Sequence, residues 1–352
     1  MSLTAYIITA TIKSLIVIHI LLGAVAYTVW LERKVVGHIQ NRWGPTRVGP
    51  FGLLQPIADG LKFILKEDLT PPYVHKFLFL LAPLLAVVMA LTSIAVIPFG
   101  ETVQIGKFPV DLQITSARNP DGSVGDINIG LLLLLGVTSL AVYGVALAGW
   151  SSNSKYSLLG SLRASAQMVS YELSLGLSLV GVLMLSGTLS LRQIVEQQSG
   201  GILNWNFFSG WQFLAFFVYL IAAYAETNRI PFDLPEAETE LVAGYHTEYS
   251  AMKFAMFFMA EYANMVTVAS IATLLFFGGW DGPLFGPPIV RMLLPIFWFV
   301  LKVFLFIFLY IWVRGTLPRF RYDQLMSFGW KVLLPLAIAN ILITGFVMAV
   351  RS

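Results

Sequence analysis

Eight long apolar runs dominate the chain, separated by segments rich in glycine, proline and charged residues. A helix needs about 20 apolar residues to cross a bilayer, and only helices or closed barrels satisfy their own backbone there. The runs lack the alternation of barrel strands. We therefore predict an all-α membrane protein of about eight transmembrane helices in a single domain, residues 1–352. The predicted spans are residues 10–31, 77–98, 128–150, 158–186, 211–226, 252–278, 291–313 and 330–350.

Composition supports a membrane location. Hydrophobic residues make up 57% of the chain and charged residues 12%, whereas soluble proteins have about 25% charged residues. The first run contains Lys13 and His19 and lacks a small-residue cleavage site, so we interpret it as a retained span rather than a signal peptide. The sequence has no cluster of basic residues of the kind that binds nucleic acid, so we do not expect nucleic acid as a partner.

The distribution of lysine and arginine predicts the orientation, because cytoplasmic loops are enriched in these residues. Of the 22 such residues, 15 lie in the loops and helix ends after the first, third, fifth and seventh spans. We therefore expect both termini on the outer side and these loops in the cytoplasm. The remaining seven are Lys13, Lys107, Arg118, Arg192, Arg291, Lys302 and Arg351.

Two of the cytoplasmic loops are long. In residues 31–76, "GLLQPIADGLKFILKED" has apolar positions at helical spacing, which predicts an amphipathic helix at the membrane surface. Residues 226–251 form the second loop, which is acidic. On the outer side, "SARNPDGSVGD" is expected to be a plain polar loop.

The chain contains no cysteine and four scattered histidines. Disulfides, iron–sulfur ligation by this chain and c-type haem attachment are therefore excluded, and a membrane b-haem is not expected. We predict that this chain binds no metal or redox cofactor.

Three ionisable residues fall inside predicted spans: Glu172, Glu261 and Lys302. Each costs at least about 2.5 kcal/mol to place there, and such residues usually face a protein interior or a wet cavity. They could simply pair and fasten helices together. We favour a proton relay, in which burial raises a glutamate pKa and a nearby cation lowers it. Lys302 is the candidate cation.

The second loop gathers acidic residues between two spans. Asn228, Pro231 and Pro235 predict an irregular segment there. A solvated loop is the simpler interpretation. However, apolar residues are interleaved with the acids, so we favour a partly buried, hydrated acidic funnel leading toward Glu172 and Glu261.

Four motifs make the sequence specific: "LERKVVGHIQNRWGPTRVGPFGLLQPIADGLKFILKED", "GWSSNSKYSLLGSLRASAQMVSYE", "AETNRIPFDLPEAETELVAGYHTEYSAMKFAMFFMAEY" and "RGTLPRFRYDQLM". Together they resemble the H-type (mitochondrial subunit 1 type) membrane-subunit family of proton-pumping NADH:quinone oxidoreductase, respiratory complex I. The outer loop after the second span looks longer than in mitochondrial forms, which favours a bacterial plasma membrane.

The resemblance implies a membrane subunit that helps to form a quinone chamber and couples quinone reduction to proton translocation. It is not catalytic alone. FMN and iron–sulfur clusters would belong to partner subunits of the peripheral arm, and quinone would be the substrate. "PRFRYDQLM" looks like a docking loop for those partners. Membrane lipids are also expected to contact the chain.

By motif, the resemblance assigns quinone-binding positions to Arg33, Arg42, Asp59, Lys62 and Phe232. The two arginines could instead anchor the chain to anionic lipid head groups. Positions on the proton path correspond to Glu172, Glu226, Glu236, Glu238, Glu240, Glu248, Glu261 and Lys302.

Other classes of protein fit less well. A free-standing proton-coupled transporter should show repeated halves and a midplane substrate site, and neither is evident. A purely structural anchor leaves the mid-membrane charges unexplained. A membrane subunit of an energy-converting hydrogenase shares pieces of these loops, but the full "RIPFDLPEAE" favours the quinone enzyme.

Overall fold

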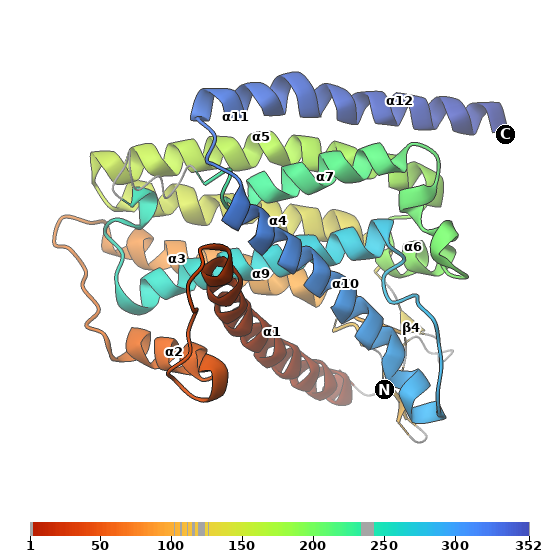
Figure 1. Ribbon diagram of the computed structural model, residues 1–352, viewed down its shortest axis with the longest axis horizontal. Coiled ribbons are helices and arrows are strands. Elements are labelled where there is room, and N and C mark those ends of the chain that lie inside the picture. The colour runs from red at the N-terminus through yellow and green to blue at the C-terminus, as the bar shows by residue number, and fades with distance from the viewer. Residues whose placement is uncertain are drawn as a thin grey trace.

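The computed structural model describes residues 3–101, 103–105, 108–110, 112–114, 117–118, 124–125, 127–233 and 243–351. The helices of the bundle run roughly side by side, and both termini lie at the same end, opposite α2 (Figure 1). The described α-helices are α1 (Leu3–Ile39), α2 (Gln55–Leu65), α3 (Lys76–Ala95), α4 (Gly130–Ser151), α5 (Lys155–Ser186), α6 (Leu191–Gln197), α7 (Gln212–Glu226), α9 (Ala251–Phe276), α10 (Pro288–Thr316), α11 (Tyr322–Phe328) and α12 (Leu334–Arg351).

Within the described residues, seven helical stretches are long and apolar enough to cross a membrane, and α7 is a shorter apolar helix of 15 residues. The all-α prediction with about eight spans is therefore confirmed. The last stretch joins α11 to α12 through a π-helical turn at Gly329–Leu333. As predicted, α7 ends at Glu226.

Close packing of α3, α4 and α5 depends on glycine. A Cβ at Gly144 would lie 3.1 Å from the backbone nitrogen of Ala86 in α3, and one at Gly149 would overlap Ser161 in α5. These contacts hold α4 against α3 at Gly144 and against the first turns of α5 at Gly149. The bundle is thus built around helices whose small residues allow backbones to approach.

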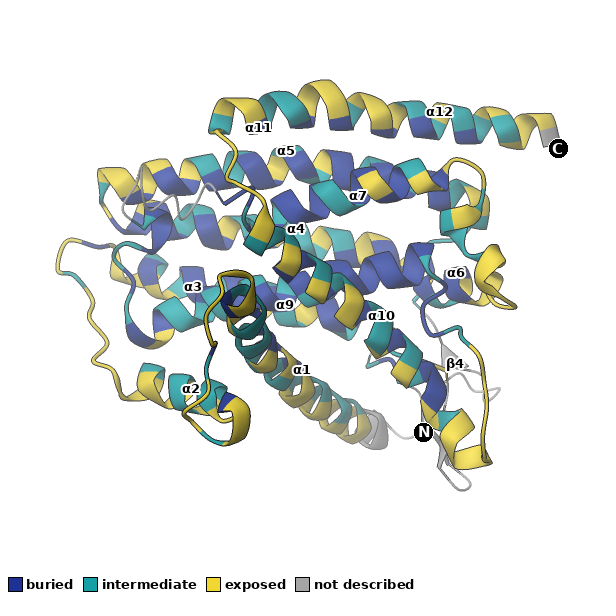
Figure 2. Ribbon diagram, in the orientation of Figure 1, coloured by how far each residue is buried: buried dark blue, intermediate teal, exposed yellow. Residues whose placement is uncertain are grey.

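Burial differs sharply between the helices (Figure 2). In α9, 56% of the most apolar window is buried within the chain, against 17% in α1. Helix α9 is therefore the central helix of the bundle, and α1, α10 and α12 leave wide apolar faces for lipid or for other proteins.

A helix, α2, stands where the amphipathic helix was predicted and packs against α1 and α9 at one end of the bundle (Figure 1). Its position at the membrane surface stays a prediction. Its apolar residues Ile57, Leu61 and Ile64 are exposed in the isolated chain. The segment predicted to be a plain polar loop, residues 116–126, contains in its described part the paired strands β3 (Ala117–Arg118) and β4 (Val124–Gly125). Before it, β1 (Val103–Ile105) pairs with β2 (Phe108–Val110).

Candidate functional site

The chain leaves α7 deep inside the bundle. The side-chain amide of Gln167 in α5 donates to the carbonyl oxygens of Ala225 at 2.7 Å and Phe232 at 2.8 Å. Gln167 lies 12 residues after Lys155, which places it about 18 Å along α5. Residues 227–233 are thus held within the protein rather than in solvent.

Side chains of this segment are buried as well. Thr227, Arg229 and Asp233 are each no more than 5% exposed. The solvated-loop interpretation is therefore wrong for residues 227–233. The segment is irregular, as Asn228 and Pro231 predicted. Non-helical backbone at this depth is tolerated where protein buries it or where it lines a wet cavity.

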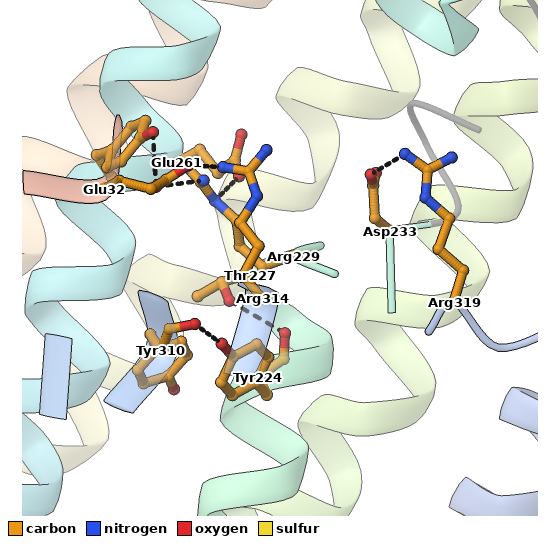
Figure 3. Close-up of polar contacts among 10 residues, drawn as sticks. Glu32, Tyr224, Thr227, Arg229, Asp233, Glu261, Tyr310, Arg314 and Arg319 are labelled. Carbon is orange, nitrogen blue, oxygen red and sulfur yellow. Dashed lines mark hydrogen bonds and ion pairs between the residues drawn. The ribbon is translucent and has the colours of Figure 1, made fainter. Parts of the chain in front are cut away.

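The centre of the site is a network of two carboxylates and two guanidinium groups, of which Glu32 and Arg229 are buried and Glu261 and Arg314 partly buried (Figure 3). Arg229 pairs with Glu32 of α1, at 3.0 Å from Nη1 to Oε2, and with Glu261 of α9. Arg314 of α10 pairs with the other oxygen of Glu32. Tyr262 donates a hydrogen bond to Glu32 at 2.9 Å, and the Arg229 guanidinium lies 4.0 Å from the centre of its ring. The network therefore joins three membrane helices to the irregular segment.

A small polar cavity adjoins the network. Its volume is about 10 Å³, and its lining includes Asn228, Arg229, Asp233, Glu261 and Arg314. That volume is about what one water molecule needs. The Oδ1 atom of Asn228 is buried and has no hydrogen-bond partner among the described residues. The carboxylate of Glu261 therefore lies beside a polar space suited to water.

Next to the network, the end of the irregular segment is fastened to the chain after α10. Arg319 pairs with the buried Asp233 at 3.1 Å, and the rings of Phe232 and Phe320 stack 5.6 Å apart. Phe232 and Phe320 also line an apolar cavity of about 520 Å³ between α7, α10 and α11. The contacts hold Phe232 in the wall of this cavity.

The other residues predicted to bind quinone lie at the end of α1 and on α2. Arg33 pairs with Asp59 at 2.6 Å, and Lys62 lies 4.0 Å from the same carboxylate. Arg42 is exposed and donates to Gln40. The structure thus brings Arg33, Asp59 and Lys62 together but does not place them against Phe232.

The predicted proton-path glutamates occupy different environments. Glu172 accepts a hydrogen bond from Ser139 in α4. Glu226 has a buried Oε2 without a hydrogen-bond partner among the described residues, and it lies near enough to Glu172 for their charges to interact. Glu248 accepts a hydrogen bond from Tyr73 at 2.6 Å. Glu236, Glu238 and Glu240 lie outside the described residues.

Lys302 was expected to be the cation beside the buried glutamates, and this expectation is wrong. Its Nζ donates to the carbonyl oxygens of Phe277, Gly279 and Asp281 at 2.7, 3.0 and 2.7 Å. Phe277 follows the end of α9, about 24 Å of helix from Glu261. Lys302 binds carbonyl groups of the irregular chain that follows α9, and Glu261 pairs with Arg229 instead.

Sequence reasoning also missed Glu32. It lies at 8% exposure, beside the more conspicuous Arg33 in the "ERK" motif. Its partners Arg229 and Arg314 are 197 and 282 residues away. The only local signal was an acidic residue close to the end of an apolar run.

His246 lies outside the spanning helices in a cage of aromatic rings. Phe254, Phe257 and Phe258 lie within 5.6 Å of its ring, and Tyr245 lies at 3.8 Å. Burial lowers the pKa of His246 from 6.5 to about 3. The imidazole is therefore neutral in the folded protein at all ordinary pH values.

We expect this histidine to make the fold sensitive to acid. The unfolded chain binds a proton below pH 6.5 and the native protein does not, so stability present above pH 6.5 is lost as the pH falls toward 3. Between pH 7 and 5 the loss is about 2 kcal/mol. His246→Phe should remove it. Retention of folded protein after mild heating at both pH values measures this; an equal loss in the variant would contradict the prediction.

Among the described residues, no group of three or more His, Cys, Asp or Glu side chains could hold a metal ion. The fold and the site thus define a multi-pass α-helical membrane protein with a network of charged side chains beside the irregular segment that follows α7. The chain belongs to the NADH dehydrogenase family, whose sequence profile matches residues 12–345. The resemblance drawn from the four motifs is confirmed.

Three related proteins align with this chain over nearly their whole length. The second H-type subunit of NADH-quinone oxidoreductase from Koribacter versatilis is 71% identical over 352 residues, 99% of each chain. Its counterpart of the same name from Geobacter metallireducens is 54% identical over 346 residues, 98% of this chain and 97% of its own. The H-type NADH-quinone oxidoreductase subunit of Thermomicrobium roseum is 50% identical over 348 residues, 97% and 96% of the two chains.

Proposed function

We propose that this protein is a membrane subunit of a bacterial proton-translocating NADH–quinone oxidoreductase, complex I, in which it couples quinone reduction to proton translocation. The observation that carries the proposal is the network of Glu32, Arg229, Glu261 and Arg314. Placing a network of charged side chains within a membrane domain costs free energy. If the network served only to hold helices together, it would not need the polar cavity beside it. The names of the relatives support the quinone enzyme over a hydrogenase subunit.

The quinone chamber is proposed at the cytoplasmic end of the bundle. Arg33, Arg42, Asp59 and Lys62 would contribute polar groups and Phe232 an apolar wall. Glu32 precedes Arg33 directly in α1, so a charge change at the chamber lies one residue from the network. This adjacency provides the physical connection between quinone chemistry and the membrane interior.

Coupling would work through competition for Arg229. Its guanidinium pairs with both Glu32 and Glu261, so protonation of one carboxylate strengthens the interaction with the other. The proton would then pass toward Glu226 and Glu172, whose charges interact. Glu236, Glu238, Glu240 and Glu248 of the acidic loop are proposed to supply protons from the cytoplasm.

The remaining proposals concern the assembly. Electrons would reach quinone from FMN and iron–sulfur clusters in partner subunits without passing through this chain, which lacks cysteine. The loops at residues 31–76 and 226–251 would face the cytoplasm, with both termini on the outer side of the plasma membrane. Lipid would cover the exposed apolar faces of the outer helices.

Glu261→Gln in the assembled complex tests the proposal. Glutamine keeps the size and a hydrogen-bonding group but cannot carry a proton, so coupled NADH–quinone turnover should fall about 100-fold while assembly is retained. Glu196→Gln is the matched control, because the Glu196 side chain is 60% exposed. Unchanged turnover and pumping in Glu261→Gln would remove this residue from the relay.

A further inference from the structure

A row of polar and small residues lies along one face of α5 and starts close to the end of α7, where Glu226 is located. Gln167, Ser174, Ser178 and Gly181 are spaced by seven, four and three residues, which places them on the same side of the helix. All three polar side chains are completely buried. Helices α7 and α12 pack against α5, and the three lie together in the bundle (Figure 1).

Several polar atoms along this interface have no hydrogen-bond partner among the described residues. They are Gln167 Oε1, Ser174 Oγ, Gln212 Oε1 and both amide atoms of Asn340. Each of these side chains is at most 1% exposed. An unsatisfied buried polar group costs several kcal/mol where lipid surrounds the protein, so each of these atoms requires a partner.

At the outer end of the row, two amides converge on a glycine. A Cβ at Gly181 would lie 2.6 Å from Asn340 Nδ2 and 2.8 Å from Gln212 Oε1. The other amide atom of Gln212 donates to Thr344 at 2.9 Å. Absence of a side chain at position 181 therefore leaves polar groups from α7 and α12 facing the backbone of α5.

At its inner end the row begins beside a carboxylate. Gln167 donates to the carbonyl of Ala225, and the next residue is Glu226, whose Oε2 is itself buried without a partner among the described residues. From Gln167 to Gly181 the helix rises about 21 Å. The row thus extends from the proposed proton path to the end of the bundle where both termini lie (Figure 1).

We propose that buried water molecules occupy the interface of α5, α7 and α12, and that they carry protons from Glu226 to the outer surface. Each water would bond to the polar atoms named above, as buried waters do in other proteins. Transfer would proceed by proton hops between neighbouring waters, with each water giving up one proton as it gains another. The inference rests on the proposed function, because it supplies the outlet of that path.

High-resolution imaging and proton pumping by the purified complex in liposomes together test the outlet. We expect ordered water density within hydrogen-bond distance of Asn340 and Gln212. Asn340→Leu and Ser174→Val remove polar groups and fill the space, so protons translocated per NADH oxidised should fall about twofold. If one of the two variants does not assemble, the proton ratio can still be measured in the other.

Ser170→Val is the matched control. Ser170 lies one turn before Ser174, but its hydroxyl already donates to Ala166 of its own helix at 2.7 Å. A direct bond between the two amides without water density, or an unchanged proton ratio in both variants, would overturn the outlet. If Glu261→Gln still blocks coupled turnover in that case, the proposed function stands and the protons leave elsewhere.

Discussion

Arg229→Met is expected to prevent accumulation of the assembled complex. Arg229 is 5% exposed and pairs with Glu32 and Glu261 at once. Methionine is of similar length and lacks the charge, so Glu261 would lose this pairing within the bundle. Removal of one partner from a buried pair costs about 3–5 kcal/mol. The amount of intact complex in membranes, measured on native gels, reports the loss.

Two further variants serve as controls. One removes an arginine at an exposed position, and the other keeps the positive charge at position 229 but changes the shape of the side chain. Arg291→Met removes an exposed arginine near the start of α10, outside the segments expected to bind quinone or partner subunits, so it should leave assembly unchanged. Arg229→Lys keeps the charge but loses the planar fork that reaches two carboxylates, and it should give an intermediate amount. Equal amounts of complex in Arg229→Met and Arg291→Met would refute the structural role of the network.

Gly149→Ala should be nearly as damaging, although it adds only one methyl group. The new Cβ would overlap Oγ of Ser161 and would lie 2.6 Å from the carbonyl oxygen of Ser157. A side chain could rotate away, but the backbone of α5 could not, so α4 and α5 would have to separate. Overpacking of this kind costs about 1–3 kcal/mol. The thermal midpoint of the detergent-solubilised protein should fall accordingly.

Gly136 provides a matched control within the same helix. Nothing lies within 4 Å of a Cβ at this position. Gly136→Ala should therefore leave the midpoint unchanged or raise it, because alanine favours a helix by about 1 kcal/mol over glycine. If both variants shifted the midpoint equally, the close approach of α4 and α5 would not be the cause.

The mid-membrane charges have two separate explanations. Lys302 is satisfied by three carbonyl groups of the chain after α9 and by the ring of Trp205, 4.4 Å away. Glu261 lies beside a polar cavity and pairs with Arg229, a residue outside the regular helices. The depth of a charged residue in a span therefore does not show whether its role is structural or functional. The groups that it contacts distinguish the two roles.

Much of the fold could be predicted from local sequence. Hydropathy predicted the spans and the short helix that ends at Glu226, and helical spacing of apolar residues predicted a helix in the first loop. The helix-breaking residues Asn228 and Pro231 predicted the irregular segment. These features depend on the solvation of consecutive residues and on backbone preferences, which act within a few positions along the chain.

The composition of the site could be predicted only in part. Glu261 stood out because a carboxylate interrupts an apolar run, whereas Glu32 sits at the edge of one and carries no such signal. The row of buried polar residues on α5 could not be predicted either, because the sequence does not say which face of α5 the other helices cover. Their significance appears only when α7 and α12 cover them.

By itself, the sequence determined that the chain crosses the membrane repeatedly, where α7 ends, and which motifs place it in its family. Only the tertiary structure decided that Arg229 joins Glu32 to Glu261, that Lys302 binds carbonyl groups of the chain after α9, and that Asn340 faces Gly181. The physical reason is that hydropathy is a sum over neighbouring residues. Charge pairing and burial depend on contacts between helices that lie far apart in the chain.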